Sequence, residues 1–251
     1  MAGHSRWANI RHKKAKEDAK RSKVFTKIIK ELTVAAREGG GDPTGNPRLA
    51  LAVENAKSCN LPKDNMERAI KRGTDKLNDG SSLEEVSFEG YGPGGIAYYI
   101  EATTDNNNRT VSELRHIFTK YGGNMGINGS VSFLFEQKGM ISLPAEGVDE
   151  ENFLLEAIEA GADDVIIERS ATLFIVMTER TKLFSVRNKL EAAGYTIEQA
   201  ELVREATMET KVDAEMARAN FNMIETFEEN NDVTNVFTNL LMDEETMNAV
   251  D

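Results

Sequence analysis

Residues Gly139 to Arg204 read GMISLPAEGVDEENFLLEAIEAGADDVIIERSATLFIVMTERTKLFSVRNKLEAAGYTIEQAELVR, and the pattern of this stretch is the most informative about the fold. Short apolar runs alternate in it with segments of helical period that end at Gly161 and Gly194. The predicted elements, in order, are strand Met140–Leu143, helix 150–160, strands Val165–Ile167 and Leu173–Met177, a helix marked by Leu183, Val186 and Leu190, and strand Tyr195–Val203. This strand-helix-strand-strand-helix-strand order is typical of a ferredoxin-like module.

The segments on either side of this stretch repeat the same order. They are strand Ile96–Ala102, helix 109–121 and strand Val131–Phe135, then strand Glu209–Val212, helix 213–229 and strand Val233–Asn239. The stretch 139–204 separates the two central strands of this flanking module, so we predict that the second module is inserted into the first. The hinge is expected near Glu136–Lys138 and Glu205–Met208. Gly92-Pro93-Gly94-Gly95 joins two predicted strands and therefore favours a hairpin turn over a phosphate-binding loop.

Residues before this region predict a helical domain. An apolar face that begins near Val24 lies opposite a stripe of lysines on the first helix, and Asn46-Pro47 suits the cap and first residue of a second helix. A third helix is expected to end at Gly73, and Gly80-Ser81-Ser82 resembles a linker. The fold class is thus α+β and multidomain: an N-terminal three-helix bundle followed by two ferredoxin-like modules, the second inserted in the first. The expected domains are 1–78, 79–137 plus 205–251, and 138–204.

Charge is divided unevenly along the chain. The formal net charge is −12, but residues 1–72 hold 17 basic and 8 acidic side chains, a net of +9, and the remainder holds 13 basic and 34 acidic ones, a net of −21. Such asymmetry indicates a polyanion as the partner of the basic end. The acidic modules are expected to face away from it or to meet a basic partner such as a protein.

The basic end carries the candidate nucleic-acid-binding residues. Lysines recur at steps of three and four residues and form one helical stripe, preceded by a cationic arm. The candidates are Arg6, Trp7, Arg11, Lys13, Lys14, Lys16, Lys20, Arg21, Lys23, Lys27 and Lys30. Trp7 lies among arginines, and an exposed tryptophan there can stack on an unpaired base. The alternative is an amphipathic helix whose lysine face is merely solvated.

A second polar cluster, Asp105-Asn106-Asn107-Asn108-Arg109-Thr110, precedes a predicted helix. Asp and Asn at such a position ordinarily cap the helix. The functional alternative is a polar, anion-facing edge; its candidate residues are Asp105, Asn106, Asn108 and Arg109.

The sequence shows none of the residue patterns that identify an enzyme. It lacks a nucleophile elbow, a His-Glu-x-x-His motif and paired histidines at metal spacing, so we expect no catalytic residues, metal, cofactor or small-molecule substrate. Cys59 is the only cysteine, which excludes a disulfide framework and fits a reducing cytoplasm. No apolar run reaches the length of a membrane span, so we expect no membrane partner.

Several motifs resemble the YebC family. They begin with Ala2-Gly3-His4-Ser5-Arg6-Trp7-Ala8-Asn9-Ile10-Arg11-His12-Lys13-Lys14 and continue with Asp18-Ala19-Lys20-Arg21, Phe25-Thr26-Lys27, Gly40-Gly41-Asp42-Pro43, Asn46-Pro47-Arg48-Leu49, Pro62-Lys63-Asp64-Asn65, Tyr91-Gly92-Pro93-Gly94-Gly95, Thr104-Asp105-Asn106, Asn108-Arg109-Thr110 and Gly129-Ser130-Val131. The likeness covers nearly the whole chain. It implies a helical N-terminal domain with two α+β domains, and no agreed catalytic residues. That family includes DNA-binding transcriptional regulators, the mitochondrial translational activator of cytochrome c oxidase subunit I, and bacterial members implicated in translation.

Two functions therefore stay open. The first is a DNA-binding regulator of transcription, as the resemblance implies. The second is a ribosome-associated translation factor whose basic domain contacts ribosomal RNA and whose acidic modules reach basic ribosomal proteins or tRNA. The sequence shows no helix of the kind that dimeric proteins place on the two half-sites of a DNA operator. The net charge of −21 beyond residue 72 also opposes wrapping of a DNA duplex around the protein.

Overall fold

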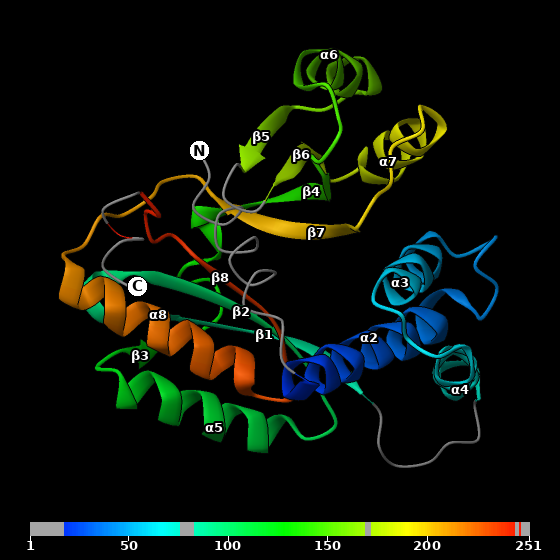
Figure 1. Cartoon of the computed structure of the whole chain (residues 1–251). Coiled ribbons are helices and arrows are strands. Elements are labelled where there is room, and N and C mark those ends of the chain that lie inside the picture. The colour runs from blue at the N-terminus through cyan, green and yellow to red at the C-terminus, as the bar shows by residue number, and fades with distance from the viewer. Residues whose placement is uncertain (1–17, 76–82, 169–171, 244–245, 247–251) are drawn as a thin grey trace. The chain divides into compact units, whose positions relative to one another are not determined.

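The computed structural model describes residues 18–75, 83–168, 172–243 and 246. The N-terminal part of the described chain is helical: α2 spans Asp18–Gly39, α3 Pro47–Ser58 and α4 Lys63–Thr74 (Figure 1). The predicted linker around Gly80 and the cationic arm before Asp18 lie outside the described residues.

Apolar side chains from these three helices form one small core. Its buried members are Leu32, Ala35, Ala36, Leu49, Ala52, Ala56, Leu61 and Ala69. Phe25, Ile28 and Ile29 of α2 pack against it, as do Met66 and Ile70 of α4. Leu49, Ala52 and Ala56 thus form the inward face of α3, and Met66, Ala69 and Ile70 form that of α4. Val24 is 38% exposed, however, so the apolar face of α2 begins at Phe25.

Two residues fix how these helices meet. Asn46 caps α3 by accepting from the amide of Leu49, and its own amide donates to the carbonyls of Ala35 and Gly40 at 2.8 Å each. Gly73 was expected to end the third helix, but α4 runs one residue further. A Cβ at Gly73 would lie 2.3 Å from the carbonyl oxygen of Thr33, so glycine is required there because the backbone of α2 passes so close.

The described chain divides into two compact units. The sheet A unit holds 83–136 and 204–243 with Thr246, and the sheet B unit holds 18–75 and 137–203. The chain thus leaves the first unit after Glu136 and returns to it at Arg204, so a whole α+β module is inserted there. Within the sheet B unit, the side-chain amide of Asn55 donates a hydrogen bond to the backbone carbonyl of Ala200 and accepts one from its backbone N–H. These two bonds connect α3 to the inserted α+β module.

Sheet A is antiparallel and has the strand order β3-β1-β2-β8. The strands are β1 Glu84–Tyr91, β2 Ala97–Thr104, β3 Asn124–Met125 and β8 Val233–Thr238; the helices are α5 Asn107–Lys120 and α8 Ala214–Glu229. The predicted hairpin is confirmed, because β1 and β2 pair from Glu84 opposite Thr104 to Tyr91 opposite Ala97, around the short 3-10 turn η1 Pro93–Gly95. Helices α5 and α8 cover one face of the sheet (Figure 1).

Two predicted strands of this unit are wrong. Residues 131–135 form the 3-10 turn η2 Ser132–Leu134 and then the first residue of β4. Residues 209–212 make only an isolated bridge from Thr210 to Leu240. Sheet A is completed by β1 and not by a strand at 209–212, because a hairpin pairs locally and loses less chain entropy than a distant strand would.

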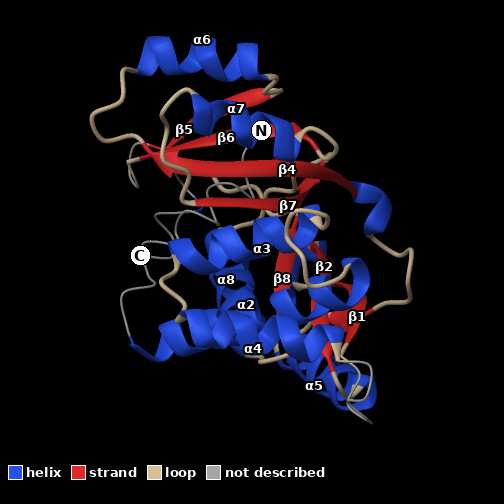
Figure 2. Ribbon diagram, turned by 90° about the vertical axis from the view of Figure 1, so that its right-hand side faces the viewer, coloured by secondary structure: helices blue, strands red, loops and turns tan. Residues whose placement is uncertain are grey.

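Sheet B is the ferredoxin-like module predicted from the sequence. Its strands are β4 Phe135–Pro144, β5 Asp164–Glu168, β6 Leu173–Glu179 and β7 Gln199–Ala206, in the order β5-β6-β4-β7; α6 spans Glu150–Ala160 and α7 Leu183–Ala192 (Figure 2). The α+β class with N-terminal helices and two antiparallel sheets is therefore confirmed. Gly161 ends α6 with a left-handed φ of 110°.

The core of sheet B lies between the strands and these two helices. Phe153 of α6 stacks on Phe174 of β6 at a ring distance of 4.4 Å and meets the edge of Tyr195 at 5.0 Å. Ile158 and Leu155 of α6 are each 63% exposed. Phe153, Ala157 and Ala160 alone supply the fully buried contacts of α6, because these three share the face of the helix that meets the sheet.

Candidate nucleic-acid interface

Only the later part of the predicted lysine stripe lies within the described residues. Of the predicted binding residues, Arg6, Trp7, Arg11, Lys13, Lys14 and Lys16 lie outside the described residues. Lys20 and Arg21 belong to the first turn of α2. Lys23, Lys27 and Lys30 follow on the same helix and are half-buried. The structure therefore brings the described members of the stripe onto one helix, as their spacing predicted.

Helix α4 adds exposed cations to the same domain. Lys71 and Arg72 lie in its last turn, and among the residues that the structure describes they make no ion pair. Lys63 and Arg68 are also exposed, but Lys63 faces Glu67 at 3.6 Å and Arg68 donates to Asn65 at 2.9 Å. Helices α2 and α4 pack against each other, so two neighbouring helices carry the basic side chains.

Other charges of this domain are matched within it. The guanidinium of Arg48 on α3 contacts Glu31 at 2.8 Å and Glu38 at 2.7 Å, both on α2. This pairing holds α3 to α2 and withdraws two acidic side chains from competition with the lysines. A nucleic-acid phosphate could contact the exposed cations in the last turn of α4 without breaking an ion pair within the protein. The contact would release counterions from the nucleic acid, which favours binding.

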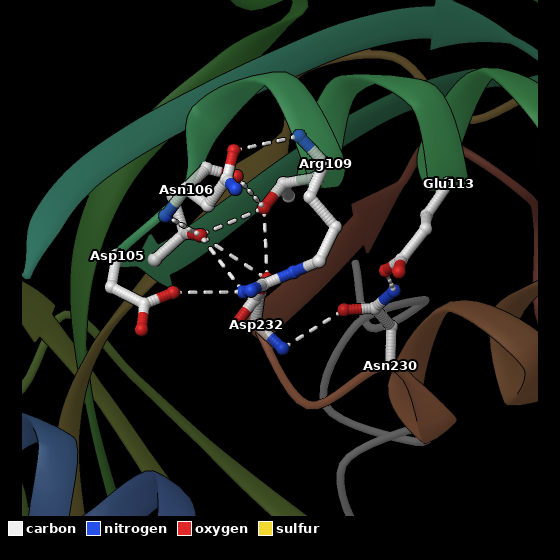
Figure 3. A network of polar contacts seen from close by, with 8 residues as sticks. Asp105, Asn106, Arg109, Glu113, Asn230 and Asp232 are labelled. Carbon is white, nitrogen blue, oxygen red and sulfur yellow. Dashed lines mark hydrogen bonds and ion pairs between the residues drawn. The ribbon is translucent and has the colours of Figure 1, made fainter.

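The second polar cluster forms a network around a buried carboxylate. Asp232, at the start of β8, is 5% exposed, and its Oδ2 lies 2.6 Å from Arg109 Nη2 and 2.8 Å from Thr110 Oγ1 (Figure 3). Thr104 Oγ1, at the end of β2, is 3.2 Å from the same oxygen. The Asp232 backbone carbonyl accepts from the amide of Thr103. Asp232 therefore ties the start of β8 to the end of β2 and to the first turn of α5.

Arg109 is held between two carboxylates. Its Nη2 contacts Asp105 at 3.0 Å as well as Asp232, and hydrogen bonds first to Asp232 and then to Asp105 raise the pKa of the guanidinium above its ordinary value. Asn106 caps α5 by accepting from the amide of Arg109 at 3.1 Å. The charge of Arg109 is thus matched inside the protein. An anion-facing role for Asp105, Asn106, Asn108 and Arg109 stays a prediction.

Sequence reasoning missed two buried carboxylates, Asp232 and Glu89. Glu89 directly follows the buried Phe88 in β1, and Asp232 directly precedes the buried Val233 of β8; an acid beside a core residue is the signal that could have found them. Lys, Glu, Arg and Asp are almost never fully buried unless paired, so an acid buried beside a core residue requires a set of donors around it. Glu89 receives three backbone amides of the loop after β3.

Neither a metal centre nor a membrane segment is found in the described part of the chain. Within 18–75, 83–168 and 172–243, no three His, Cys, Asp or Glu side chains gather as a metal site. None of the described helices combines the length and the apolar character that a bilayer crossing requires. Cys59 is exposed at the end of α3.

Comparison with known proteins gives a consistent result along the chain. Residues 5–76 match the family described as TACO1/YebC protein N-terminal domain, and residues 83–240 match TACO1/YebC second and third domain. A probable transcriptional regulatory protein of Persephonella marina is 53% identical over 251 residues, which is 100% of both chains. One from Pseudomonas syringae pv. syringae is 48% identical and covers 98% of each.

A solved structure agrees with these relatives. The crystal structure of a conserved hypothetical protein from Aquifex aeolicus superposes with a TM-score of 0.87 at 46% identity, over 92% of this chain and 95% of that one. The two family matches together span most of the chain, and curated relatives named as probable transcriptional regulatory proteins align along nearly all of it, so the chain belongs to the TACO1/YebC family.

Proposed function

We propose that this protein regulates gene expression by binding nucleic acid through its N-terminal helical domain, with duplex DNA as the primary target. The observation that carries the proposal is the concentration of positive charge on α2 and α4 in a chain whose net charge is −12. The names of the relatives support a regulatory role, and many regulators of transcription act by contacting DNA. The proposal assigns no enzymatic step and places the protein in the cytoplasm.

Phosphate contacts supply the affinity in this proposal. The arm residues Arg6, Arg11, Lys13, Lys14 and Lys16 and the α2 residues Lys20, Arg21, Lys23, Lys27 and Lys30 are the proposed contacts, joined by Lys71 and Arg72 of α4. Such contacts position a protein on the backbone but carry no sequence information. Sequence preference would then come from DNA shape or from a partner protein.

Structured RNA is the second candidate target, and the acidic character of the chain beyond the helical domain is the observation in its support. The chain beyond residue 72 has a net charge of −21, which opposes close wrapping by a duplex. An RNA loop can meet the helical domain alone, and it offers unpaired bases on which Trp7 can stack. Under this alternative the protein is a translation factor that binds ribosomal RNA.

The first prediction tests the interface by charge reversal. The double variant Lys71→Glu, Arg72→Glu should weaken binding to a 30-base-pair DNA duplex at least several-fold, measured by fluorescence anisotropy at two or more salt concentrations. The slope of log affinity against log salt should fall by roughly 0.9 for each duplex phosphate that the variant no longer neutralises, or about 0.7 for single strands. A further variant reverses Lys13, Lys16 and Lys20, which tests the arm in the same way.

A matched control separates position from total charge. Arg115→Glu, Lys120→Glu makes the same change of four charge units on exposed residues of α5, in the acidic sheet A unit. This control should leave affinity nearly unchanged. Equal losses in both double variants would mean that net charge alone governs binding, and the proposed interface would then be wrong. A hairpin-loop RNA titrated alongside the duplex decides between the two targets.

A further inference from the structure

The loop between β3 and β4 displays apolar side chains to solvent. Ile127 is 82% exposed and Phe133 is 71% exposed. The backbone amide of Thr207 donates to the carbonyl of Leu134 at 2.8 Å, which brings the segment of Met208, 70% exposed, beside this loop. We call Ile127, Phe133 and Met208 the apolar tip of the sheet A unit. They are the three most exposed large hydrophobic side chains of the described residues.

A buried carboxylate holds this loop in place. Glu89, in the middle of β1, is 4% exposed. Its two oxygens accept from the backbone amides of Gly129 at 2.8 Å, Val131 at 2.6 Å and Ser132 at 2.9 Å. The Glu89 carbonyl also accepts from the amide of Gly126 at 2.8 Å. These three charge-assisted hydrogen bonds fix the backbone of the loop both before and after Ser130.

Further contacts shape the same loop. The Tyr91 hydroxyl donates to the carbonyl of Ser130 at 2.9 Å. Gly129 has a left-handed φ of 90°, and a Cβ at Gly126 would lie 2.6 Å from Ser130 Oγ. The backbone conformation at Gly129 therefore favours glycine, whereas a side chain at position 126 would have to displace the Ser130 hydroxyl.

A simple connection between two strands does not need such a scaffold. Burying a carboxylate costs free energy that its hydrogen bonds must offset, and exposing Ile127 and Phe133 gains nothing in the free protein. The scaffold lowers the entropy that binding would cost, because the loop is already ordered before a partner arrives. Exposed apolar side chains on a rigid support are typical of an interaction site.

Charge identifies the kind of partner. Residues 83–136 and 204–243 hold 6 Lys and Arg against 16 Asp and Glu, a net of −10. Exposed Glu136 lies three residues after Phe133. Phosphates would be repelled by this unit, which argues against stacking of a nucleic-acid base on Phe133. A positively charged protein surface with an apolar pocket matches both features.

We propose that the apolar tip docks into an apolar pocket on a basic partner protein, with Phe133 as the central anchor. The inference does not depend on nucleic-acid binding by the helical domain, since it concerns the other unit and other residues. A basic partner that itself lies on nucleic acid would then let the acidic unit approach a polyanion that repels it directly.

Photo-crosslinking from the anchor position tests the proposal. The full-length protein is expressed in its native host with p-benzoylphenylalanine in place of Phe133, and in a matched control the same residue replaces Leu155, 63% exposed on α6 of the sheet B unit. Position 133 should yield a discrete adduct with one protein whose isoelectric point exceeds about 9. Position 155 should not yield that adduct. Adducts with nucleic acid, with a second copy of this chain or with an acidic protein would overturn the proposal, as would equal adduct yields at both positions.

The affinity of the full-length protein for the purified partner identified by crosslinking gives a quantitative test. Phe133→Ser and Ile127→Ser should each weaken this affinity about tenfold or more, the loss typical of an anchor side chain. Leu155→Ser should leave it unchanged. The affinity should also fall as salt rises, because opposite charges meet at the rim. All three side chains are exposed, so unchanged thermal melting is expected and separates lost docking from lost folding. Unaltered affinity in both tip variants would contradict the proposal.

Discussion

At the scale of single residues, buried charge is the main determinant of loop and terminus geometry in the sheet A unit. Glu89 is compensated by backbone amides of one loop, whereas Asp232 is compensated by Arg109 and two threonine hydroxyls. Each carboxylate holds together backbone or side-chain groups that are distant in sequence. Removing a hydrogen-bond partner from either carboxylate would leave a buried charge unpaired and would destabilise the fold.

Glu89 gives a pH-dependent prediction. Burial by itself raises the pKa of this carboxyl, but hydrogen bonds from Gly129, Val131 and Ser132 outweigh burial and leave the pKa below its ordinary value of 4.5. A lowered pKa means that the stabilisation is fully present above about pH 4.5 and is lost as the pH falls through the folded-state pKa. The hydrogen-exchange protection factors of the Gly129, Val131 and Ser132 amides should therefore stay constant from neutral pH down to about pH 4.5 and then decline.

A charge-removing variant tests the same point at neutral pH. Glu89→Gln should lower protection of those amides by roughly one to two orders of magnitude, the effect of losing about 1.5–3 kcal/mol of charge-assisted hydrogen bonding. Glu84→Gln, at an exposed position of the same strand, serves as the control and should change nothing. Full protection in Glu89→Gln would show that the loop does not depend on the carboxylate.

At the scale of elements, close backbone approach sets the geometry of the helical domain. Helix α4 crosses α2 at Gly73, where a Cβ would lie 2.3 Å from the Thr33 carbonyl and 2.9 Å from the Ala36 side chain. The Thr33 hydroxyl also lies 3.3 Å from the carbonyl of Ala69 on α4. Periodicity predicted these helices and their inward faces, but the glycine in the last turn reflects their crossing and not a helix end.

Substitution of this glycine should destabilise the domain. In Gly73→Ala the added methyl group meets a backbone carbonyl that cannot rotate away, an overpacking cost of about 1–3 kcal/mol. The gain in helix propensity from alanine is about 1 kcal/mol, so a net loss is expected. Gly45→Ala is the control, because a Cβ there meets nothing within 4 Å and its φ is not left-handed. Urea denaturation followed by circular dichroism should show a lower midpoint for the first variant only; equal midpoints would mean that the helices shift apart freely.

At the scale of the whole molecule, the two sheets differ in how their strands are distributed along the chain. All four strands of sheet B lie between 135 and 206, whereas β8 of sheet A is separated from β2 by the inserted module. Arg204 shows how the returning chain is held: its side chain pairs with Glu101 at 3.0 Å and lies over the Tyr99 ring at 4.0 Å, both on β2.

This difference predicts unequal behaviour of fragments. A fragment of residues 135–206 should fold on its own with a cooperative thermal transition, because it contains every strand and both helices of sheet B. The matched fragment 83–136 should remain unfolded, since it lacks α8 and β8 and leaves the edge of β2 and the buried Phe118 uncovered. Circular dichroism melts of the two fragments provide the measurement. An unfolded 135–206 fragment would show that the inserted module depends on the rest of the chain.

The local elements and the class of the fold could be predicted from the sequence. Hydrophobic period, glycine stops and the Asn46-Pro47 cap located α3, α6, α7 and α8 closely, because these signals act within one or two helical turns. The order of elements in 139–204 was sufficient for the ferredoxin-like module, and the steps of three and four residues placed the described lysines on one helix.

The pairing of strands in sheet A and the burial of polar groups together depend on the tertiary structure. The β1–β2 hairpin belongs to sheet A and the predicted strand 209–212 does not, because strand pairing depends on a competition among all available strands and not on the pattern of any one. Asp232 meets Arg109, and Glu89 meets the loop at Gly129, across more than a hundred and about forty residues of chain respectively. A sequence pattern describes only the neighbours of a residue along the chain. It therefore does not predict contacts between residues that are far apart in sequence and close in space.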